Sequence, residues 1–563
     1  MSVIESYLQR TRVAYLSMEI ALRSEMHTYS GGLGVLAGDC VRSAADLDLP
    51  MVFVTLASRQ GYLQQEIDPN GLQLDHADPW EPGDWATALP DVMVATIEGR
   101  HVWARPWLYE WVSSRGSRIP VLLLDTDIDR NDPRDRDITH RLYGGDEAYR
   151  LKQEIVLGIG GEQVLRSLGF TIETYHLNEG HAALLPLALL QREGRTPTGD
   201  YDTEMVKRRC VFTTHTPVEA GHDRFSYELV ERILGSFMDL DEIKALAGRD
   251  HLNMTHLALN LSSYVNGVSL RHGEVTRNMF PGYRIHAITN GVHPGQWVHP
   301  AFARVFGRIA TDWDIEPEKL AAATRIPDEE IWRAHEQVKS GLIAMVRDAT
   351  GKSLDPGRPI IGYARRMTSY KRAGLLLSDW SRLADICNRY PFQIVMSGKA
   401  HPRDEGGKQL IHQITMQAHH AGVPIAFVPN YNMELAKLIV AGSDIWLNTP
   451  LPPLEASGTS GMKAALNGVL NFSTLDGWWL EGCEEGVTGW AIGQDDGAGD
   501  HARLLYDKLE STILPLYAEN RSAWIGMMKH AIARIGPVFN TQRMMRAYAR
   551  EAYFAEVEPS STA

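Results

Sequence analysis

The segment from Glu455 to Lys463, Glu-Ala-Ser-Gly-Thr-Ser-Gly-Met-Lys, combines residue types that suit an anionic ligand. Its glycines allow the backbone to approach a ligand closely, and a helix that starts here offers free N–H groups and the positive end of a dipole. Lys463 can neutralise a phosphate group or form an imine with an aldehyde. Clusters of Gly, Ser and Thr are as often plain turns, and a lysine after such a turn is usually solvated. The segment is not a Walker A loop, because the glycine-to-lysine spacing differs and no Ser or Thr follows Lys463.

A second candidate site is a group of cations, Arg365, Arg366, Lys371 and Arg372, which follows the predicted strand 360–363. Such a run usually forms a solvated basic patch. The whole chain carries a net charge of −14, so cations that gather behind a buried strand are better explained by bound anions. The group therefore predicts an anion site at the end of this strand.

The segment Gly32-Leu33-Gly34-Val35-Leu36-Ala37 satisfies the pattern G-x-G-x-x-A of a dinucleotide-binding loop. The next predicted strand, 51–56, is followed by Ala57, Ser58 and Arg59, with no acid placed to bind an adenosine ribose. We therefore favour a loop whose backbone N–H groups point at inorganic phosphate over one that binds a nicotinamide dinucleotide.

These residues lie at the ends of predicted strands in an alternating α/β pattern. In the first half we predict a long amphipathic helix over 147–168 and strands over 13–18, 51–56, 121–124, 172–177, 210–213 and 285–288. In the second half we predict strands over 360–363, 393–396, 424–428, 445–447 and 469–471. The pattern is typical of βαβ units in largely parallel sheets, which bind ligands at strand–helix junctions. Polar helices are predicted over 297–356, so the halves divide near residue 290 or within that stretch.

The totals argue against several classes of protein. At 563 residues the chain exceeds what one hydrophobic core usually supports, so we expect two domains. No apolar run approaches the roughly 18 residues of a membrane span and no signal peptide is recognised, so we expect a cytoplasmic protein without membrane contacts. The 4 cysteines have no C-x-x-C spacing, which argues against disulfides and a zinc site. The acidic net charge argues against a nucleic-acid partner, and since H-E-x-x-H is absent we expect no catalytic metal.

Several motifs, in order along the chain, resemble those of one enzyme family. The segment 455–463 resembles the pyridoxal-phosphate lysine motif of the α-glucan phosphorylases (glycogen, starch and maltodextrin phosphorylases) in their compact bacterial form. Further motifs match in family order: 13–19 (VAYLSME), 30–37 (SGGLGVLA), 177–181 (LNEGH), 289–292 (TNGV), 365–372 (RRMTSYKR), 397–400 (SGKA) and 429–431 (PNY). One departure is Thr368-Ser369, where animal members have His-Glu, so the local hydrogen bonds there should differ.

The resemblance implies two Rossmann-like, doubly wound α/β domains that face a cleft, the GT-B architecture of glycosyltransferases. We expect an N-terminal domain over 1–290 with the glycine loop and sugar contacts, and a C-terminal domain over 291–563 with the cofactor and phosphate site. A helix over about 541–557 should cross back onto the first domain. The implied cofactor is pyridoxal 5′-phosphate on Lys463, bound also by Arg365, Thr459, Ser460 and Gly461.

The resemblance also implies which residues act on the substrates. Arg366 and Lys371 would hold the phosphate substrate and, with Lys463 and His181, form the catalytic set. The other substrate contacts carried over are Gly32, Leu33, Asn290, Tyr370, Glu455, Ser457 and Gly458, with Asp146 in a mobile loop over the site. Without the family context, His181 and Tyr370 are equally typical of packing residues.

The family reaction moves the terminal glucosyl unit of an α-1,4-glucan to orthophosphate with retention, giving α-glucose 1-phosphate. Expected partners are therefore an α-glucan or maltooligosaccharide and inorganic phosphate. The main alternative is a nucleotide-sugar glucosyltransferase such as a glycogen synthase, and a second is a non-catalytic glucan-binding relative. The preferred glucan and a homodimeric state stay open. Because the first strand begins near Val13, where animal members have a preceding regulatory segment, we expect activity independent of phosphorylation and AMP.

Overall fold

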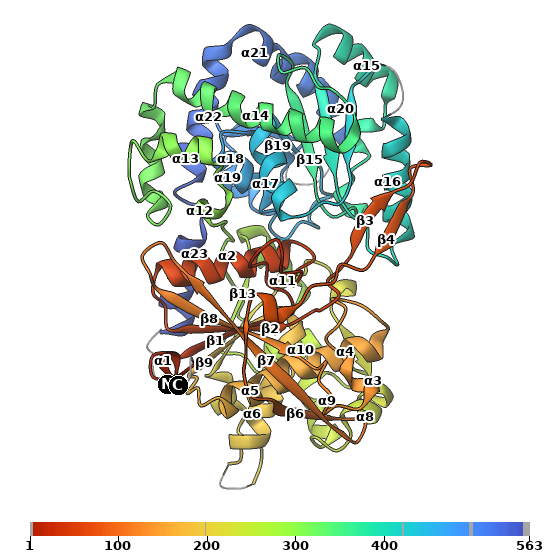
Figure 1. Cartoon of the computed structure of the whole chain (residues 1–563), viewed down its shortest axis with the longest axis vertical. Coiled ribbons are helices and arrows are strands. Elements are labelled where there is room, and N and C mark those ends of the chain that lie inside the picture. The colour runs from red at the N-terminus through yellow and green to blue at the C-terminus, as the bar shows by residue number, and fades with distance from the viewer. Residues whose placement is uncertain (1–3, 197–198, 419–421, 495–498, 555–563) are drawn as a thin grey trace.

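The computed structural model describes residues 4–196, 199–418, 422–494 and 499–554, and two β-sheets dominate it (Figure 1). The first sheet has the strand order β14-β13-β10-β9-β1-β2-β8-β7-β5, with β6 paired to β7. Its parallel strands are β1 (Val13–Ser17), β2 (Met51–Leu56), β8 (Arg118–Asp125), β9 (Thr174–Asn178), β10 (Cys210–Thr213), β13 (Tyr264–Gly267) and β14 (His286–Ala287).

An antiparallel edge completes the first sheet. It consists of β5 (Thr87–Ala88), β6 (Val92–Ile97) and the long β7 (Arg100–Val112), which pairs along β8. These strands were not predicted, because β7 alternates buried residues such as Val102, Ala104 and Leu108 with half-buried ones and does not form a continuous apolar run. Among the parallel strands of this sheet, β13 was not predicted either.

The second sheet is parallel throughout, in the order β17-β16-β15-β18-β19-β20. Its strands are β15 (Ile360–Ala364), β16 (Gln393–Ser397), β17 (Ile425–Val428), β18 (Ile445–Asn448), β19 (Leu470–Thr474) and β20 (Gly489–Ile492). Every residue of β15 and β16 is buried, as expected where helices cover both faces of a parallel sheet. All the strands predicted in this half are present, and β20 is additional.

The predicted helix over 147–168 is confirmed with a change of winding. It consists of α4 (Glu147–Ile155), a π-helical turn (Val156–Gly160) and α5 (Gly161–Ser167). The polar stretch between the sheets includes α12 (Pro294–Trp297), α13 (Pro300–Phe306) and α14 (Asp328–Thr350). Gly351 ends α14 with a positive φ of 72°, a conformation that favours glycine at this position.

The chain returns to the first sheet at its end. Helix α23 (Thr541–Tyr548) packs on α2 (Gly32–Asp46), and a π-helical turn follows over Ala549–Tyr553 (Figure 1). The hydroxyl of Thr541 lies 2.6 Å from that of Ser43, and Tyr548 joins the core beside β1. Residues 555–557 of the predicted C-terminal helix lie outside the described residues.

A β-hairpin of the first half reaches across to the second sheet. It pairs β3 (Gln64–Ile67) with β4 (Gln73–His76) and lies against α16 (Glu405–Gln417), as Figure 1 shows. The side-chain amide of Gln65 donates to the carbonyl of Gly398 at 2.8 Å, and that of Gln73 donates to Ala400 at 2.9 Å. These buried hydrogen bonds hold the two halves together beside the cleft described below.

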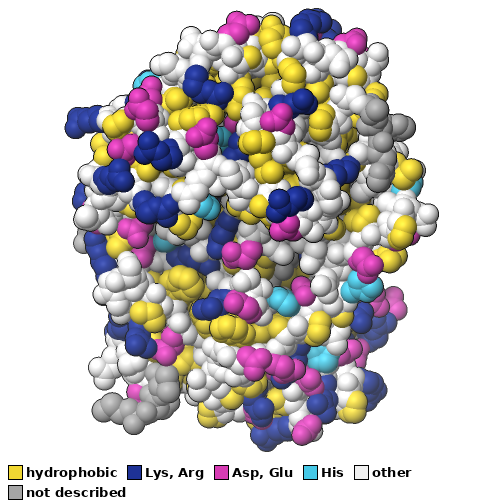
Figure 2. Space-filling view, turned by 45° about the horizontal axis from the view of Figure 1, so that its top comes forward, with side chains coloured by type: hydrophobic (Ala, Val, Ile, Leu, Met, Phe, Trp, Pro, Cys, Tyr) yellow, Lys and Arg dark blue, Asp and Glu magenta, His cyan; other side chains and the backbone are white. Residues whose placement is uncertain are grey.

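No helix in the described part of the chain is long and apolar enough to cross a lipid bilayer. On the face drawn in Figure 2, acidic and basic side chains are interspersed, and neither sign forms a broad field.

Candidate functional site

A cleft of about 920 Å³ lies between the two sheets. Residues that follow β15 and β18 line one side, and residues at the start of α2 and after β9 line the other. Every residue that the family resemblance assigns to the site lines the cleft except Gly461. Gly461 lies behind the wall, where an added Cβ would stand 2.3 Å from Asn471 Oδ1, so its lack of a side chain serves packing.

Lys463 enters the cleft from the short helix α18 (Ser460–Leu466), which connects β18 and β19 as the motif predicts. The residue is only 7% exposed, and its Nζ lies 3.6 Å from the centroid of the Trp297 ring. Within the described residues no hydrogen-bond acceptor contacts this Nζ. Burial lowers the pKa of Lys463 to about 8, partly opposed by Asp39. At pH 7 about a tenth of this amine is therefore uncharged, more than for an ordinary lysine, and the uncharged form is the one that reacts with an aldehyde.

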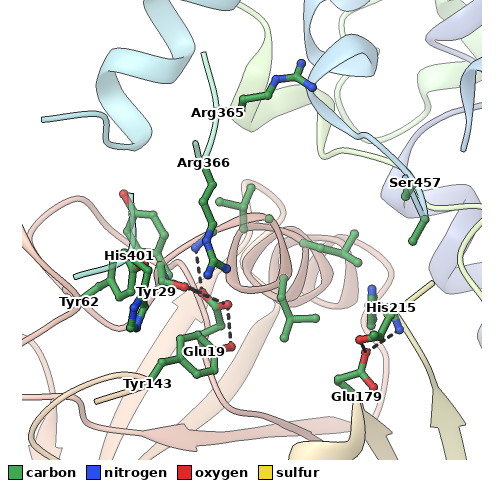
Figure 3. Close-up of a pocket in the computed structure, with 18 of the residues that line it drawn as sticks. Glu19, Tyr29, Tyr62, Tyr143, Glu179, His215, Arg365, Arg366, His401 and Ser457 are labelled. Carbon is green, nitrogen blue, oxygen red and sulfur yellow. Dashed lines mark hydrogen bonds between the residues drawn. The ribbon is translucent and has the colours of Figure 1, made fainter. Parts of the chain in front are cut away.

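Arg365 and Arg366 follow β15 and point in opposite directions (Figure 3). The backbone N–H of Arg365 donates to Ser397, so the strand pairing continues and successive side chains alternate. The Arg365 side chain is buried; its Nε has no partner among the described residues, and its Nη2 lies 3.4 Å from Ser460 Oγ. Arg366 instead points toward the part of the cleft lined by Glu19 and Tyr143.

The other two cations of this group behave differently from each other. Lys371 forms an ion pair with Glu455 and lies over the Tyr370 ring. Burial lowers the pKa of Lys371, but Glu455 and Tyr370 outweigh it, so the pKa is raised. Arg372 does not line the cleft: it donates to the carbonyls of Thr449 and Pro450 at 2.8 and 2.9 Å. The interpretation of all four cations as anion ligands is thus wrong for Arg372, which satisfies carbonyls at the end of β18.

Three side chains predicted to bind substrate carry buried polar atoms without a partner among the described residues. These atoms are His181 Nδ1, Asn290 Oδ1 and Ser457 Oγ, and all three residues line the cleft. Burial and the nearby Arg150 lower the pKa of His181 to about 3, so the imidazole is neutral at neutral pH. Because buried polar atoms in proteins are nearly always hydrogen-bonded, these atoms indicate a ligand rich in hydroxyl groups.

The two parts of the segment 30–37 have different hydrogen bonds. The backbone amides of Ser30 and Gly31 bond to the Glu19 carboxylate at 2.5 and 3.1 Å and are not available to a phosphate. The next amides, of Gly32 and Leu33 at the start of α2, have no acceptor in the described part of the chain. A Cβ added to Gly32 would meet no atom within 4 Å, so space for a ligand remains there. Only the second part of the loop fits an anion.

Asp146 and Gly458 have clear local roles. Asp146 caps α4, with its carboxylate accepting from the Tyr149 amide at 2.9 Å, beside the cleft. Gly458 has a φ of 84°, a region that favours glycine, and thereby turns the segment between Glu455 and α18. Thr459 stands at the N-cap of that helix.

Several cleft residues were missed from the sequence. Glu179 adopts an unusual φ of 72°, and its carboxylate accepts from the His215 amide at 2.7 Å and from Thr216 Oγ1 at 2.9 Å (Figure 3). Glu179 lies inside the noted segment 177–181, so that motif was a usable signal. Trp297, beneath Lys463, carried no local signal, since a lone tryptophan most often packs in a core.

A family model and many relatives match this chain. A family model described as carbohydrate phosphorylase matches residues 218–488. The maltodextrin phosphorylase of Thermococcus litoralis is 39% identical over 96% of this chain and 70% of its own length. The glycogen phosphorylase of Mycobacterium tuberculosis is 38% identical over 98% and 71% of the two chains, and that of Aquifex aeolicus is 35% identical over 96% and 86%.

Proposed function

Because this chain belongs to the carbohydrate phosphorylase family, we propose that it catalyses phosphorolysis of an α-1,4-glucan to α-glucose 1-phosphate with retention. The proposal rests mainly on one observation: three kinds of group line the same cleft. These are the buried Lys463, the arginines Arg365 and Arg366, and neutral polar atoms that have no partner among the described residues. The cations suit phosphate groups, and the neutral atoms suit sugar hydroxyls.

The residues around Lys463 fit pyridoxal 5′-phosphate. The Nζ of Lys463 has no acceptor in the described structure, and the buried Nε of Arg365 lacks one as well. Lys463 would hold the cofactor's aldehyde carbon, and Arg365, Thr459 and Ser460 would hold its phosphate, with Gly461 packing behind them. When bound, the cofactor supplies a phosphate group that exchanges a proton with the phosphate substrate.

Arg366 and Lys371 would bind the phosphate substrate and stabilise negative charge as the glycosidic bond breaks. The amides of Gly32 and Leu33 would add donors from the helix end on the opposite wall. His181, Asn290 and Ser457 would bind sugar hydroxyls, and Glu455 would orient Lys371 through their ion pair. Gly458, Tyr370 and Asp146 complete the wall around the sugar.

The arrangement of the strands in two sheets supports a division of the chain into two domains. We assign residues 1–290 and 291–563 to two Rossmann-like domains of the GT-B type, with α23 returning to the first. Acceptor glucan length, a homodimeric state and a cytoplasmic location remain predictions.

A two-part assay tests the proposal. Purified protein incubated with maltodextrin and phosphate should release glucose 1-phosphate, and its near-ultraviolet spectrum should show the cofactor band. Reduction with borohydride followed by peptide mapping should label Lys463. Glucosyl transfer from a nucleotide sugar, without phosphate-dependent release, would favour the synthase-like alternative and overturn the proposal.

A further inference from the structure

A carboxylate from the opposite half of the molecule stands behind the Lys463 site. Asp39, on α2, accepts a hydrogen bond from Trp297 Nε1 at 2.7 Å, and the same oxygen accepts from the His293 amide at 3.0 Å. The Trp297 ring lies directly against Lys463 Nζ, 3.6 Å from its centroid. Asp39 and Trp297 are each 1% exposed, so neither group exchanges these contacts for water.

The tryptophan and the lysine are also joined through their backbones. The side-chain amide of Asn467 donates to the carbonyl of Lys463 and to that of Trp297, at 2.9 Å in both cases. The backbone of the pair is therefore fixed from the second half. The indole plane is fixed from the first half, by Asp39.

The charge of Asp39 is only partly offset. Arg42 Nη1 lies 3.5 Å from Asp39 Oδ1, but the Arg42 guanidinium donates to the carbonyls of Ala21 and Leu22 at 3.2 and 2.7 Å. Asp39 Oδ1 itself has no hydrogen bond within the described residues. Two further charged or titratable groups lie in this region: Arg365 lines the same cleft as Lys463, and the backbone amide of His293 bonds to Asp39.

We propose that Asp39 is a positioning residue for Lys463: it holds the Trp297 ring beneath Nζ and, as a buried anion, stabilises positive charge on that nitrogen. This inference rests on the proposed function, in which Lys463 binds the cofactor. An anionic acceptor on the indole N–H also increases electron density on the ring face, which strengthens its attraction for a cation. This agrees with the effect of Asp39 on the pKa of Lys463: Asp39 raises this pKa, whereas burial lowers it.

The consequence is a link between the halves. Asp39 belongs to the helix that follows β1, whereas Lys463 belongs to the second sheet, so the charge state of the lysine depends on how closely the two halves meet.

The test measures the titration of Lys463 in the full-length protein freed of cofactor. Lysines are reductively methylated with formaldehyde across a pH series, and modification of the Lys463 peptide is followed by mass spectrometry. In Asp39→Asn the midpoint of the Lys463 titration should fall by about one pH unit. At pH values below that midpoint, Lys463 should then be modified about tenfold faster than in the wild type. Asp46→Asn is the matched control, since Asp46 is buried on the same helix and bonds His293 and Gln542 but not Trp297.

Trp297→Phe provides a second route if Asp39→Asn folds poorly. This variant keeps an aromatic ring but loses the N–H donor, and it should also lower the midpoint of the Lys463 titration. The double variant should shift this midpoint by less than the sum of the two single shifts. An unchanged midpoint in both variants, or an equal shift in Asp46→Asn, overturns the inference. Because this titration needs no cofactor, its failure is distinct from a failure to find cofactor or phosphorolysis.

Discussion

The two walls of the cleft differ in charge and in the spacing of their residues along the chain. The second-sheet wall (Arg365, Lys371, Glu455 and Lys463) is ionic and comes from two short segments, 365–371 and 455–463. The first-sheet wall combines neutral groups (Gly32, His181, His215 and Asn290) with carboxylates such as Glu19 and Glu179, and is gathered from distant segments. Burial lowers the pKa of both His181 and His215 to about 3, which keeps these two imidazoles uncharged. Anion chemistry and hydroxyl recognition are thus divided between the walls.

The largest expected effect lies on the ionic wall. Lys463→Ala should abolish cofactor labelling and phosphorolysis, because Lys371, the other amine of this wall, is already held in an ion pair with Glu455. Lys399→Met is the matched control: Lys399 also lines the cleft, and burial lowers its pKa to about 8, but its Nζ donates to Leu63 at 2.8 Å. Cofactor content, measured by absorbance, should be retained in Lys399→Met. Loss in both variants would contradict the assignment.

A smaller effect should separate the walls kinetically. Arg366→Ala removes a charge-assisted contact worth about 1.5–3 kcal/mol, so kcat/KM for phosphate should fall roughly ten- to a hundredfold. Glucan binding measured without phosphate should hardly change. Arg372→Gln, on the cation that bonds carbonyls outside the cleft, should lower thermal stability without raising the phosphate KM. If Arg366→Ala catalyses phosphorolysis at the wild-type rate, the phosphate substrate binds elsewhere in the protein.

Ser457→Ala should show the opposite pattern at a lower magnitude. Its buried Oγ lacks a partner, so its loss removes one neutral hydrogen bond to a sugar, worth about 1 kcal/mol or roughly fivefold in glucan affinity. Calorimetry with a maltooligosaccharide measures this. Ser460→Ala, which removes the hydroxyl near Arg365 and Trp446, should leave glucan affinity unchanged. An equal loss of glucan affinity in the two variants would contradict the assignment of sugar binding to Ser457 and not to Ser460.

The smallest expected effect concerns pH: glucan affinity should not depend on the protonation of His181. The pKa of His181 is lowered to about 3, so its neutral form is retained as the pH falls from 8 to 5. Glucan affinity without phosphate should therefore show no inflection near 6.5, the ordinary pKa of histidine. Fluorescence titrations across this range test it, and an inflection that disappears in His181→Asn would show a protonating imidazole.

Sequence patterns predicted one wall better than the other. The ionic wall was readable because its ligands lie within a few residues of a strand end, and parallel strands place such ends at one edge. Even there, Arg372 was assigned to the wrong environment, because the strand continues through Arg365 and the following turn decides which way each cation points. The antiparallel edge around β7 was missed because β7 alternates buried and half-buried residues and does not form a continuous apolar run.

The motifs and their order along the chain determined the family and the α/β alternation, and they predicted Lys463 as the reactive lysine, since these depend on residues close together in sequence. Tertiary structure alone decided that Glu19 takes the first amides of the glycine loop, that Glu179 supports His215, and that Asp39 and Trp297 stand behind Lys463. These contacts join residues 11, 36 and 258 positions apart, and the last of them joins the two halves of the molecule. Tertiary packing selects such partners, and no local sequence pattern encodes it.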